Sequence, residues 1–314
     1  MYYNGTKKAF TKGNNLDYPI PSNSDFVWIL MQRPDEREIA KISKDFRLQK
    51  KYFDLYKKEK RSARYSINPL VFVFMDYYLE GEKIKNSHIL FVLKENALII
   101  ALPAMTAFHD ELFERLAATL EASTVKNLGR LMYQFLLDDV NENYDVLDKV
   151  DNVIVSLEDM VVKNDKTSST QDVVRIKRRI HTMARRFWGS AKIIFVIKKG
   201  LVPLKIDQES MRLLDDVYDT YMHQVDILAS YKDMLSDILT LQTTKASNDL
   251  NLIIKRLTAL TVLLMVPTII ANIYGMNFQN IPELKWELGY PMALLLMIAS
   301  IIFSYLFFHR KKWI

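Results

Sequence analysis

The most informative part of this sequence lies near its C-terminus, where LTALTVLLMVPTIIANI (residues 257–273) runs into YGMN (residues 274–277) and is followed by YPMALLLMIASIIFSYLFF (residues 290–308). Neither apolar stretch carries a formal charge. Each has about the 17 to 25 residues that a helix needs to cross roughly 30 Å of hydrocarbon. We therefore expect transmembrane helices over residues 257–274 and 290–308, joined by an extracytoplasmic loop, residues 275–289.

Cationic residues flank these two stretches on the sides away from the loop. Lys255 and Arg256 precede the first stretch and the basic tail of residues 309–314 follows the second, whereas the loop carries two glutamates and one lysine. Because lysine and arginine concentrate on the cytoplasmic side of membrane helices, we expect both chain ends in the cytoplasm. The segment after Met1 lacks the apolar run of a signal peptide, so the long region before the first stretch is expected to stay in the cytosol.

The composition of this 314-residue chain narrows the classes of function. A net charge of +6 is spread among many lysines and glutamates, without an aromatic-basic nucleic-acid motif, which favours an anionic membrane surface over nucleic acid as the neighbour. Cysteine is absent, which excludes disulfides, thiolate metal sites and cysteine nucleophiles. The five histidines are scattered, and no acid-base pair, nucleophile or organic-cofactor motif indicates an enzyme.

The first third of the chain mixes strand and helix patterns. A charged helical pattern covers residues 35–46, and short segments rich in Val, Ile and Phe surround it. These expected strands are residues 26–31, 70–75, 89–93 and 97–101. We predict a cytoplasmic α/β domain over residues 1–104.

Long helices are expected in the rest of the cytosolic region. Helical periodicity runs through Val162, resumes after a break at residues 164–170 and continues to Lys198, within a helical region of residues 105–204. After the breaker Lys199-Gly200-Leu201-Val202-Pro203, neither Gly nor Pro occurs until Pro267. One helix of nearly 70 residues, roughly 100 Å long, is therefore predicted to continue from a stalk, residues 205–256, into the membrane.

Apolar residues along the stalk recur at steps of three and four, which is typical of a helix-packing seam. The seam consists of Met211, Leu214, Tyr218, Tyr221, Val225, Leu228, Tyr231, Leu235 and Ile238. It requires a partner, either the other helices of the same chain or further copies of the stalk.

Two membrane helices cannot enclose an aqueous path, so conduction would require several copies with their first helices around an axis. Continuing the same stepping gives a face on which apolar positions alternate with neutral oxygen-bearing ones. Its members are Asn251, Ile254, Leu257 or Thr258, Thr261, Met265, Thr268 and Asn272. Thr and Asn line pores but also join membrane helices, so both readings stay open.

The residues after the first apolar stretch suit a hydrated divalent cation. Mg²⁺ prefers octahedral oxygen ligands and gives up its water slowly, and a ring of Asn277 carboxamide oxygens could bind it with that water retained. Gly275 is expected to end the helix in the left-handed conformation, and Met276 to pack at the turn. Pro267 frees a backbone carbonyl near Leu263, either as a kink or as a ligand.

The order of motifs at the C-terminus resembles the CorA family of magnesium channels. The matching segments are Tyr274-Gly275-Met276-Asn277-Phe278, Pro282-Glu283-Leu284, Trp286, Gly289-Tyr290-Pro291, the second apolar stretch and Lys311-Lys312-Trp313. The resemblance implies an α+β protein of the bacterial inner or plasma membrane, a homopentamer with an N-terminal α/β domain, a cytoplasmic helical funnel and a pore lined by the first membrane helix. It makes Gly275, Met276 and Asn277 the selectivity filter.

The resemblance also assigns further residues. The pore-lining and gating rings would be Asn251, Ile254, Leu257, Met265 and Thr268, to which the stepping adds Thr261 and Asn272. Asp216 falls where the family places a stalk carboxylate of an intersubunit regulatory Mg²⁺ site, and Asp54 is the nearest candidate partner. Thr240 stands where some members have a second stalk aspartate, and Asn272 where a small residue is more usual. Mg²⁺ sensing is therefore expected to differ from that of those members.

The resulting hypothesis is Mg²⁺ uptake driven by the membrane potential and gated by cytoplasmic Mg²⁺, with Co²⁺ and Ni²⁺ as further possible ions. No Gly-rich phosphate loop is present, and no nucleotide is required. Two alternatives are a zinc transporter that resembles ZntB, and a two-span membrane anchor or sensor that conducts nothing.

Overall fold

The computed structural model describes residues 2–4, 9–11, 27–55, 62–95, 97–102, 111–112, 114–115, 118, 128–163, 170–201, 208–277 and 282–314. The chain divides into an N-terminal unit, Met1–Ile238, and a C-terminal unit, Leu239–Ile314. Helix α6 (Gln208–Tyr274) contributes its first part to one unit and its last part to the other. Its 67 residues confirm the prediction of a single helix that continues into the first apolar stretch.

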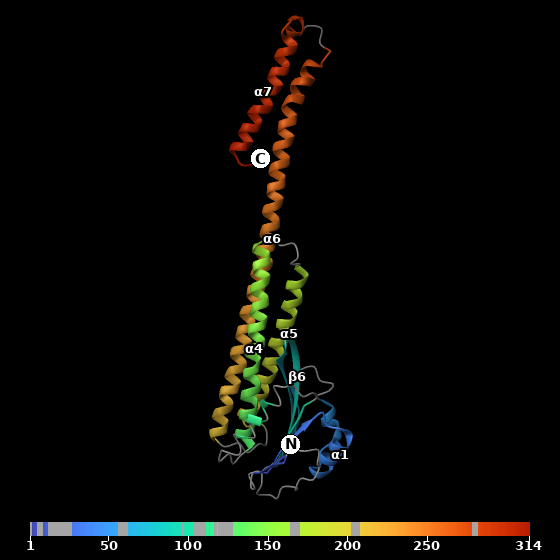
Figure 1. Ribbon diagram of the computed structural model, residues 1–314, viewed down its shortest axis with the longest axis vertical. Helices are drawn as coiled ribbons and strands as arrows, with labels where there is room; N and C mark the ends of the chain where they lie inside the picture. The colour runs from blue at the N-terminus through green and yellow to red at the C-terminus, as the bar shows by residue number, and fades with distance from the viewer. Residues whose placement is uncertain are drawn as a thin grey trace. The chain divides into compact units, whose positions relative to one another are not determined.

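A seven-stranded mixed sheet lies in the N-terminal unit (Figure 1). In chain order its strands are β1 (Tyr2–Asn4), β2 (Ala9–Thr11), β3 (Val27–Gln32), β4 (Ala63–Ile67), β5 (Leu70–Glu80), β6 (Lys83–Lys94) and β7 (Ala97–Leu102). In space they follow the order β2-β1-β3-β7-β6-β5-β4. Only β3 and β7 are parallel neighbours; the other described pairs are antiparallel.

The four strands predicted from apolar runs are confirmed as β3, β5, β6 and β7, but β5 and β6 extend beyond those runs. They form one hairpin whose register continues to the pair Glu80 and Lys83. Gly81, at φ 57°, provides the left-handed conformation that closes this tight turn. Polar residues therefore pair at the tip of the hairpin, where an apolar pattern could not indicate a strand.

Helices cover both faces of the sheet. α1 (Glu36–Asp45) and the short η1 (Lys50–Asp54) pack in one apolar cluster with β3, β5, β6 and β7. α1 begins at a capping box: the Asp35 side chain accepts the Glu38 N–H at 2.7 Å, and the Glu38 carboxylate accepts the Asp35 N–H at 2.9 Å. Burial on both faces explains why the strands are continuous apolar runs without polar alternation.

The opposite face of the sheet packs against α4 (Leu128–Val162), α5 (Thr170–Lys198) and the first part of α6 through aromatic rings. The ring of Phe74 stacks at 6.4 Å on Tyr221 of α6, and Phe91 meets Phe135 of α4 edge to face at 5.5 Å. All four side chains are buried. One aromatic layer thus fixes the first part of α6 against the sheet.

The predicted seam of α6 is the side of the helix that packs inside the N-terminal unit. Leu214, Tyr221, Leu228, Leu235 and Ile238 are buried, and the intervening seam residues are partly buried. The seam therefore has its partner within one chain, which favours the first of the two readings for this part of the helix.

The breaker after α5 is confirmed in detail at Gly200. This glycine has φ 66°, its N–H donates to the Ile197 carbonyl at 3.0 Å, and the Leu201 N–H donates to the Val196 carbonyl at 3.2 Å. These bonds form a Schellman motif, which ends a helix where a glycine takes the left-handed conformation.

Beyond its pairing with β4, the outer edge of β5 forms hydrogen bonds with side chains instead of with a strand. Among the described residues, β4 pairs with β5 only as far as Val73. Beyond it, the Met75 N–H donates to the Ser62 hydroxyl at 3.0 Å and the Tyr77 N–H donates to Asn143 Oδ1 at 3.1 Å. Asn143 is fully buried in α4, so one amide joins that helix to the sheet edge.

We predict that Asn143→Ala destabilises the protein, because the buried Tyr77 N–H loses its acceptor. The expected loss is about 1–3 kcal/mol, the desolvation penalty of an unpaired buried amide. The measurement is the apparent melting temperature of the purified protein in detergent. Asn152→Ala is the matched control, since Asn152 lies exposed on the same helix; equal effects at both positions would contradict this role of Asn143.

Candidate ion-conduction pathway

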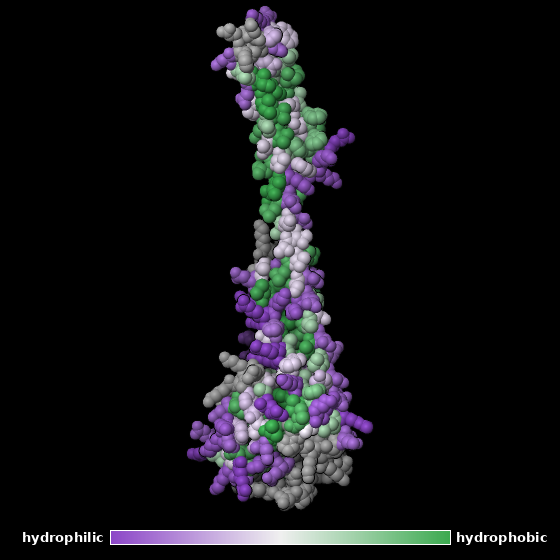
Figure 2. Space-filling view, turned by 180° about the vertical axis from the view of Figure 1, so that it is seen from behind, coloured by the Kyte–Doolittle hydropathy of each residue, from purple (hydrophilic) through white to green (hydrophobic). Residues whose placement is uncertain are grey.

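The C-terminal unit consists of the last part of α6, the short η2 (Pro282–Lys285) and α7 (Gly289–Arg310). Both long helices are apolar and long enough to cross a membrane. In their most apolar windows only 6% of the α6 residues and 17% of the α7 residues are buried, which excludes the core helices of a water-soluble domain. Figure 2 shows the hydrophobic side chains that cover much of this unit's surface. Hydrocarbon or further copies of the chain must cover them.

The buried side chains among the described residues of this unit are small, except that of Phe308, which stacks on Trp313 near the end of α7. Ala259, Ala293 and Ser304 are buried, whereas Leu264, Leu295 and Phe303 between them are more than 60% exposed. Small side chains allow membrane helices to approach closely. The small residues can be found in the sequence, but their positions alone do not show which helices pack against each other.

The predicted pore-facing residues lie on an exposed stretch of α6. Ile254, Leu257 and Met265 are 59%, 62% and 56% exposed, and the polar members of the set are exposed as well. Those polar members are Asn251, Thr261, Thr268 and Asn272. The single chain therefore leaves this whole face available to water or to neighbouring copies.

The two threonines on this face are oriented by the helix backbone. Thr261 Oγ1 donates to the Leu257 carbonyl at 2.9 Å, and Thr268 Oγ1 donates to the Leu264 carbonyl at 2.7 Å. Because each hydroxyl hydrogen is used inside the helix, the oxygen presents its lone pairs outward. Such an oxygen accepts hydrogen bonds from the water around a cation.

The prediction that Gly275 adopts the left-handed conformation is wrong. Among the described glycines only Gly81 and Gly200 have positive φ. The Gly275 N–H instead donates to the Ala271 carbonyl at 2.9 Å, which extends the helical hydrogen bonding by one residue, and the Met276 N–H donates to Ile273 at 3.3 Å. The backbone here remains close to helical, so it does not require glycine for its conformation.

Met276 and Asn277 follow directly, and both are exposed. None of the described residues buries Asn277, so its carboxamide oxygen is exposed just beyond the end of α6 within the part of the chain that the structure describes. Met276 is 48% exposed, and residues 278–281 lie outside the described part of the chain, so the packing of Met276 at this turn stays a prediction.

Gly289 belongs to the Gly289-Tyr290-Pro291 motif, and the structure gives it a physical role. The Gly289 N–H donates to the Trp286 carbonyl at 2.9 Å, and a Cβ at this position would clash with the carbonyl oxygen of Glu283. Glycine thus permits the tight approach of η2 to the first turn of α7, and it fixes how the loop re-enters the apolar helix.

We predict that Gly289→Ala destabilises the C-terminal unit, because the methyl group displaces the Glu283 backbone. Glu287→Ala, at an exposed loop position, is the control and should be neutral. Size-exclusion profiles and melting curves in detergent measure the effect; unchanged behaviour of Gly289→Ala would show that the loop has room there.

The two candidate regulatory carboxylates lie on different elements, Asp216 on α6 and Asp54 at the end of η1. Both are exposed. Burial raises the pKa of Tyr133 on α4, and the nearby Asp216 raises it further, which places that carboxylate beside α4. Within the described residues no group of three or more His, Asp or Glu side chains could hold a metal ion.

These features define a class: a two-span membrane protein whose first span continues a helix of a large α/β unit. Residues 23–310 match the family described as CorA-like Mg2+ transporter protein. The cobalt/magnesium transport protein CorA of Thermotoga maritima is 26% identical over 245 residues, which cover 78% of this chain and 70% of that protein. This chain therefore belongs to the CorA family, which confirms the resemblance drawn from the C-terminal motifs.

Solved structures agree on the fold. The complete CorA magnesium transporter from Methanocaldococcus jannaschii has a TM-score of 0.78 at 19% identity, and the match covers 92% of each chain. The ZntB cytoplasmic domain from Vibrio parahaemolyticus has a TM-score of 0.55 at 10% identity, covering 73% of this chain and 96% of that one. Both likenesses show that the chain has the fold of these two proteins.

Proposed function

We propose that this protein is a homopentameric channel that takes up Mg²⁺ through a cell membrane, with Co²⁺ and Ni²⁺ as further candidate ions. The observation that carries the proposal is the exposed Asn277 carboxamide at the end of an exposed, apolar α6, in a chain of the CorA family. In a ring of five copies, the first spans surround the axis and the five carboxamides converge at its extracytoplasmic end. Both chain ends lie in the cytoplasm.

The selectivity of such a ring follows from the hydration of the ion. Neutral amide oxygens accept hydrogen bonds from the water that Mg²⁺ retains, and they do not hold the ion as firmly as a ring of carboxylates. Gly275 and Met276 position Asn277, while apolar rings at Ile254, Leu257 and Met265 form the narrow gate. The hydroxyl oxygens of Thr261 and Thr268, with the amides of Asn251 and Asn272, provide polar rings between them.

The membrane potential is sufficient to drive the uptake. A divalent cation that crosses 100 mV gains about 4.6 kcal/mol, since one charge gains about 2.3 kcal/mol. No nucleotide hydrolysis and no organic cofactor is needed.

We predict that Asn277→Ala abolishes Mg²⁺ flux into liposomes while the protein keeps its oligomeric size in detergent, because the change removes the carboxamides and no buried contact. Flux is measured with a Mg²⁺-sensitive dye under an inside-negative potential. Asn152→Ala, the same substitution on an exposed face of α4, should leave flux unchanged. Normal flux through Asn277→Ala would refute the assignment of the filter.

The same liposomes distinguish the zinc alternative, which the shared cytoplasmic fold keeps open. A Mg²⁺ channel should respond to the potential and ignore a proton gradient, whereas zinc flux that follows the gradient would favour a ZntB-like transporter. Wild-type protein that conducts neither ion would indicate the two-span anchor or sensor.

Regulation is proposed to act through cytoplasmic Mg²⁺ bound between subunits. Asp216 on α6 of one copy and Asp54 on the η1 segment of its neighbour would bridge the ion, which holds the stalks in a closed, symmetric arrangement until the ion dissociates. The exposure of both carboxylates in the single chain suits an intersubunit site.

We predict that Asp216→Asn keeps the channel conducting at an internal Mg²⁺ concentration that closes the wild type. Asp219→Asn, three residues along the same helix and also exposed, is the matched control for the lost charge. Flux is recorded at increasing internal Mg²⁺; identical inhibition curves for the wild type and Asp216→Asn would rule out this regulatory ligand.

A further inference from the structure

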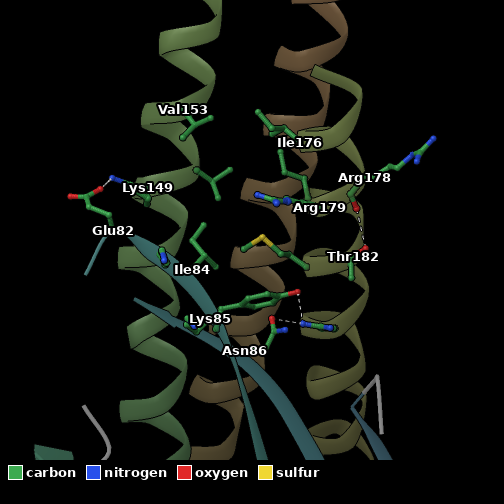
Figure 3. A pocket seen from close by; sticks show the side chains of 16 residues that line it. Glu82, Ile84, Lys85, Asn86, Lys149, Val153, Ile176, Arg178, Arg179 and Thr182 are labelled. Atoms are coloured by element: carbon green, nitrogen blue, oxygen red, sulfur yellow. Dashed lines mark hydrogen bonds and ion pairs between the residues drawn. The ribbon is translucent and has the colours of Figure 1, made fainter. Parts of the chain in front are cut away.

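An open cleft of about 770 Å³ in the N-terminal unit is not used by the proposed ion pathway. It lies between the tip of the β5–β6 hairpin and the helices α4 and α5 (Figure 3). Its volume falls within the ~300–1,000 Å³ of ordinary small-molecule sites. Its walls combine an excess of cations with apolar side chains.

The cations of this cleft greatly outnumber its acids. The positively charged residues that line it are Lys83, Lys85, Lys149, Arg179 and Arg186, and Arg178 borders it with a side chain that points away. Glu82 is the one carboxylate among the described lining residues. Glu82 is paired with Lys149, which lowers the pKa of the Glu82 carboxyl through a hydrogen bond and through its charge. The single acid is therefore already neutralised at the rim, and the charge of the arginines is not balanced within the cleft.

Arg186 is held in place by neutral groups. Its Nη1 donates to the Tyr77 hydroxyl at 2.8 Å and to Asn86 Oδ1 at 2.7 Å, and the guanidinium lies 5.1 Å from the centre of the Tyr77 ring. Its Nε is buried and has no hydrogen-bond partner. An oriented guanidinium that has no acidic partner among the described residues is suited to an oxyanion.

Arg179 provides a second guanidinium from the same helix, two turns away. Figure 3 shows its side chain pointing into the cleft between α4 and α5, whereas that of the adjacent Arg178 points away. In the part of the chain that the structure describes, Arg179 makes no ion pair. The cleft thus holds two arginines without acidic partners, on the face of α5 that looks toward the hairpin.

The remaining wall of the cleft is apolar. Ile84 of the hairpin, Val153 of α4, and Ile176 and Met183 of α5 line it. An inorganic ion alone would leave this wall in contact with water. An anion that carries an apolar or aromatic body would cover it and gain from its burial.

From this arrangement we propose that the cleft binds a small organic anion, whose phosphate or carboxylate group meets Arg179 and Arg186 and whose apolar body packs against Ile176 and Met183. Such a ligand would join the hairpin to both helices.

The test uses the full-length protein in detergent and isothermal titration with three probes: 1-naphthyl phosphate, 1-naphthoate and inorganic phosphate. The first two carry the same aromatic body and separate a phosphate ligand from a carboxylate ligand, and the third lacks the body. We expect saturable binding of at least one naphthyl probe, and weaker binding of inorganic phosphate. Arg179→Gln should weaken binding about tenfold, the effect of one charged hydrogen bond.

Arg178→Gln is the matched control, because it removes the same charge one residue away, from a residue at the border of the cleft whose side chain points away from it (Figure 3). It should leave binding unchanged, and Arg179→Lys should restore part of the loss. Equal weakening by Arg178→Gln and Arg179→Gln, or no saturable binding of any probe, would overturn the proposal. The binding is measured without ion flux, so the result does not depend on the proposed channel activity.

Discussion

The apolar side chains that α6 and α7 expose in the C-terminal unit cannot remain in water, and the other properties of the protein depend on this constraint. A helix satisfies its own backbone hydrogen bonds, so hydrocarbon can cover it without leaving polar groups unpaired. Pro267 is the one residue of the first span that lacks a backbone donor. Two helices have too little surface to enclose water, which is why the proposed transport requires several copies.

The same helix meets two different environments along its length. In the N-terminal unit, the seam residues of α6 pack on α4, α5 and the sheet, and Phe74 and Tyr221 stack at their centre. From Leu239 to the end of α6, Ala259 is the one buried residue. A helix that is continuous across this change needs no linker between the proposed regulatory carboxylate Asp216 and the proposed filter at Asn277, since Asp216 lies in this helix and Asn277 lies just beyond its end.

In the sheet, the apolar sequence pattern predicts the strands, and contacts with the helices determine how their faces and edges are covered. Its strands are apolar on both faces because α1 and η1 cover one side and three helices the other. Beyond the end of β4, two N–H groups of β5 donate to the side chains of Ser62 and of Asn143 in α4. At the hairpin tip, polar residues continue the ladder and, with α4 and α5, form the basic cleft. The packing of α4 and α5 against the sheet thus both buries the strands and forms the basic cleft.

The sequence by itself determined the two spans, the four central strands and the long stalk helix, because periodicity, charge-free length and the Gly200 breaker are local properties of the chain. The order of motifs after Tyr274 also determined the family. The tertiary structure alone decided that the seam packs within one chain and that Gly275 stays near-helical while Gly289 permits a close approach. It also decided that the Arg179 side chain points into the cleft and that of Arg178 points away from it. These outcomes depend on which distant backbone or side chain lies opposite a residue, and spacing along the sequence does not contain that information.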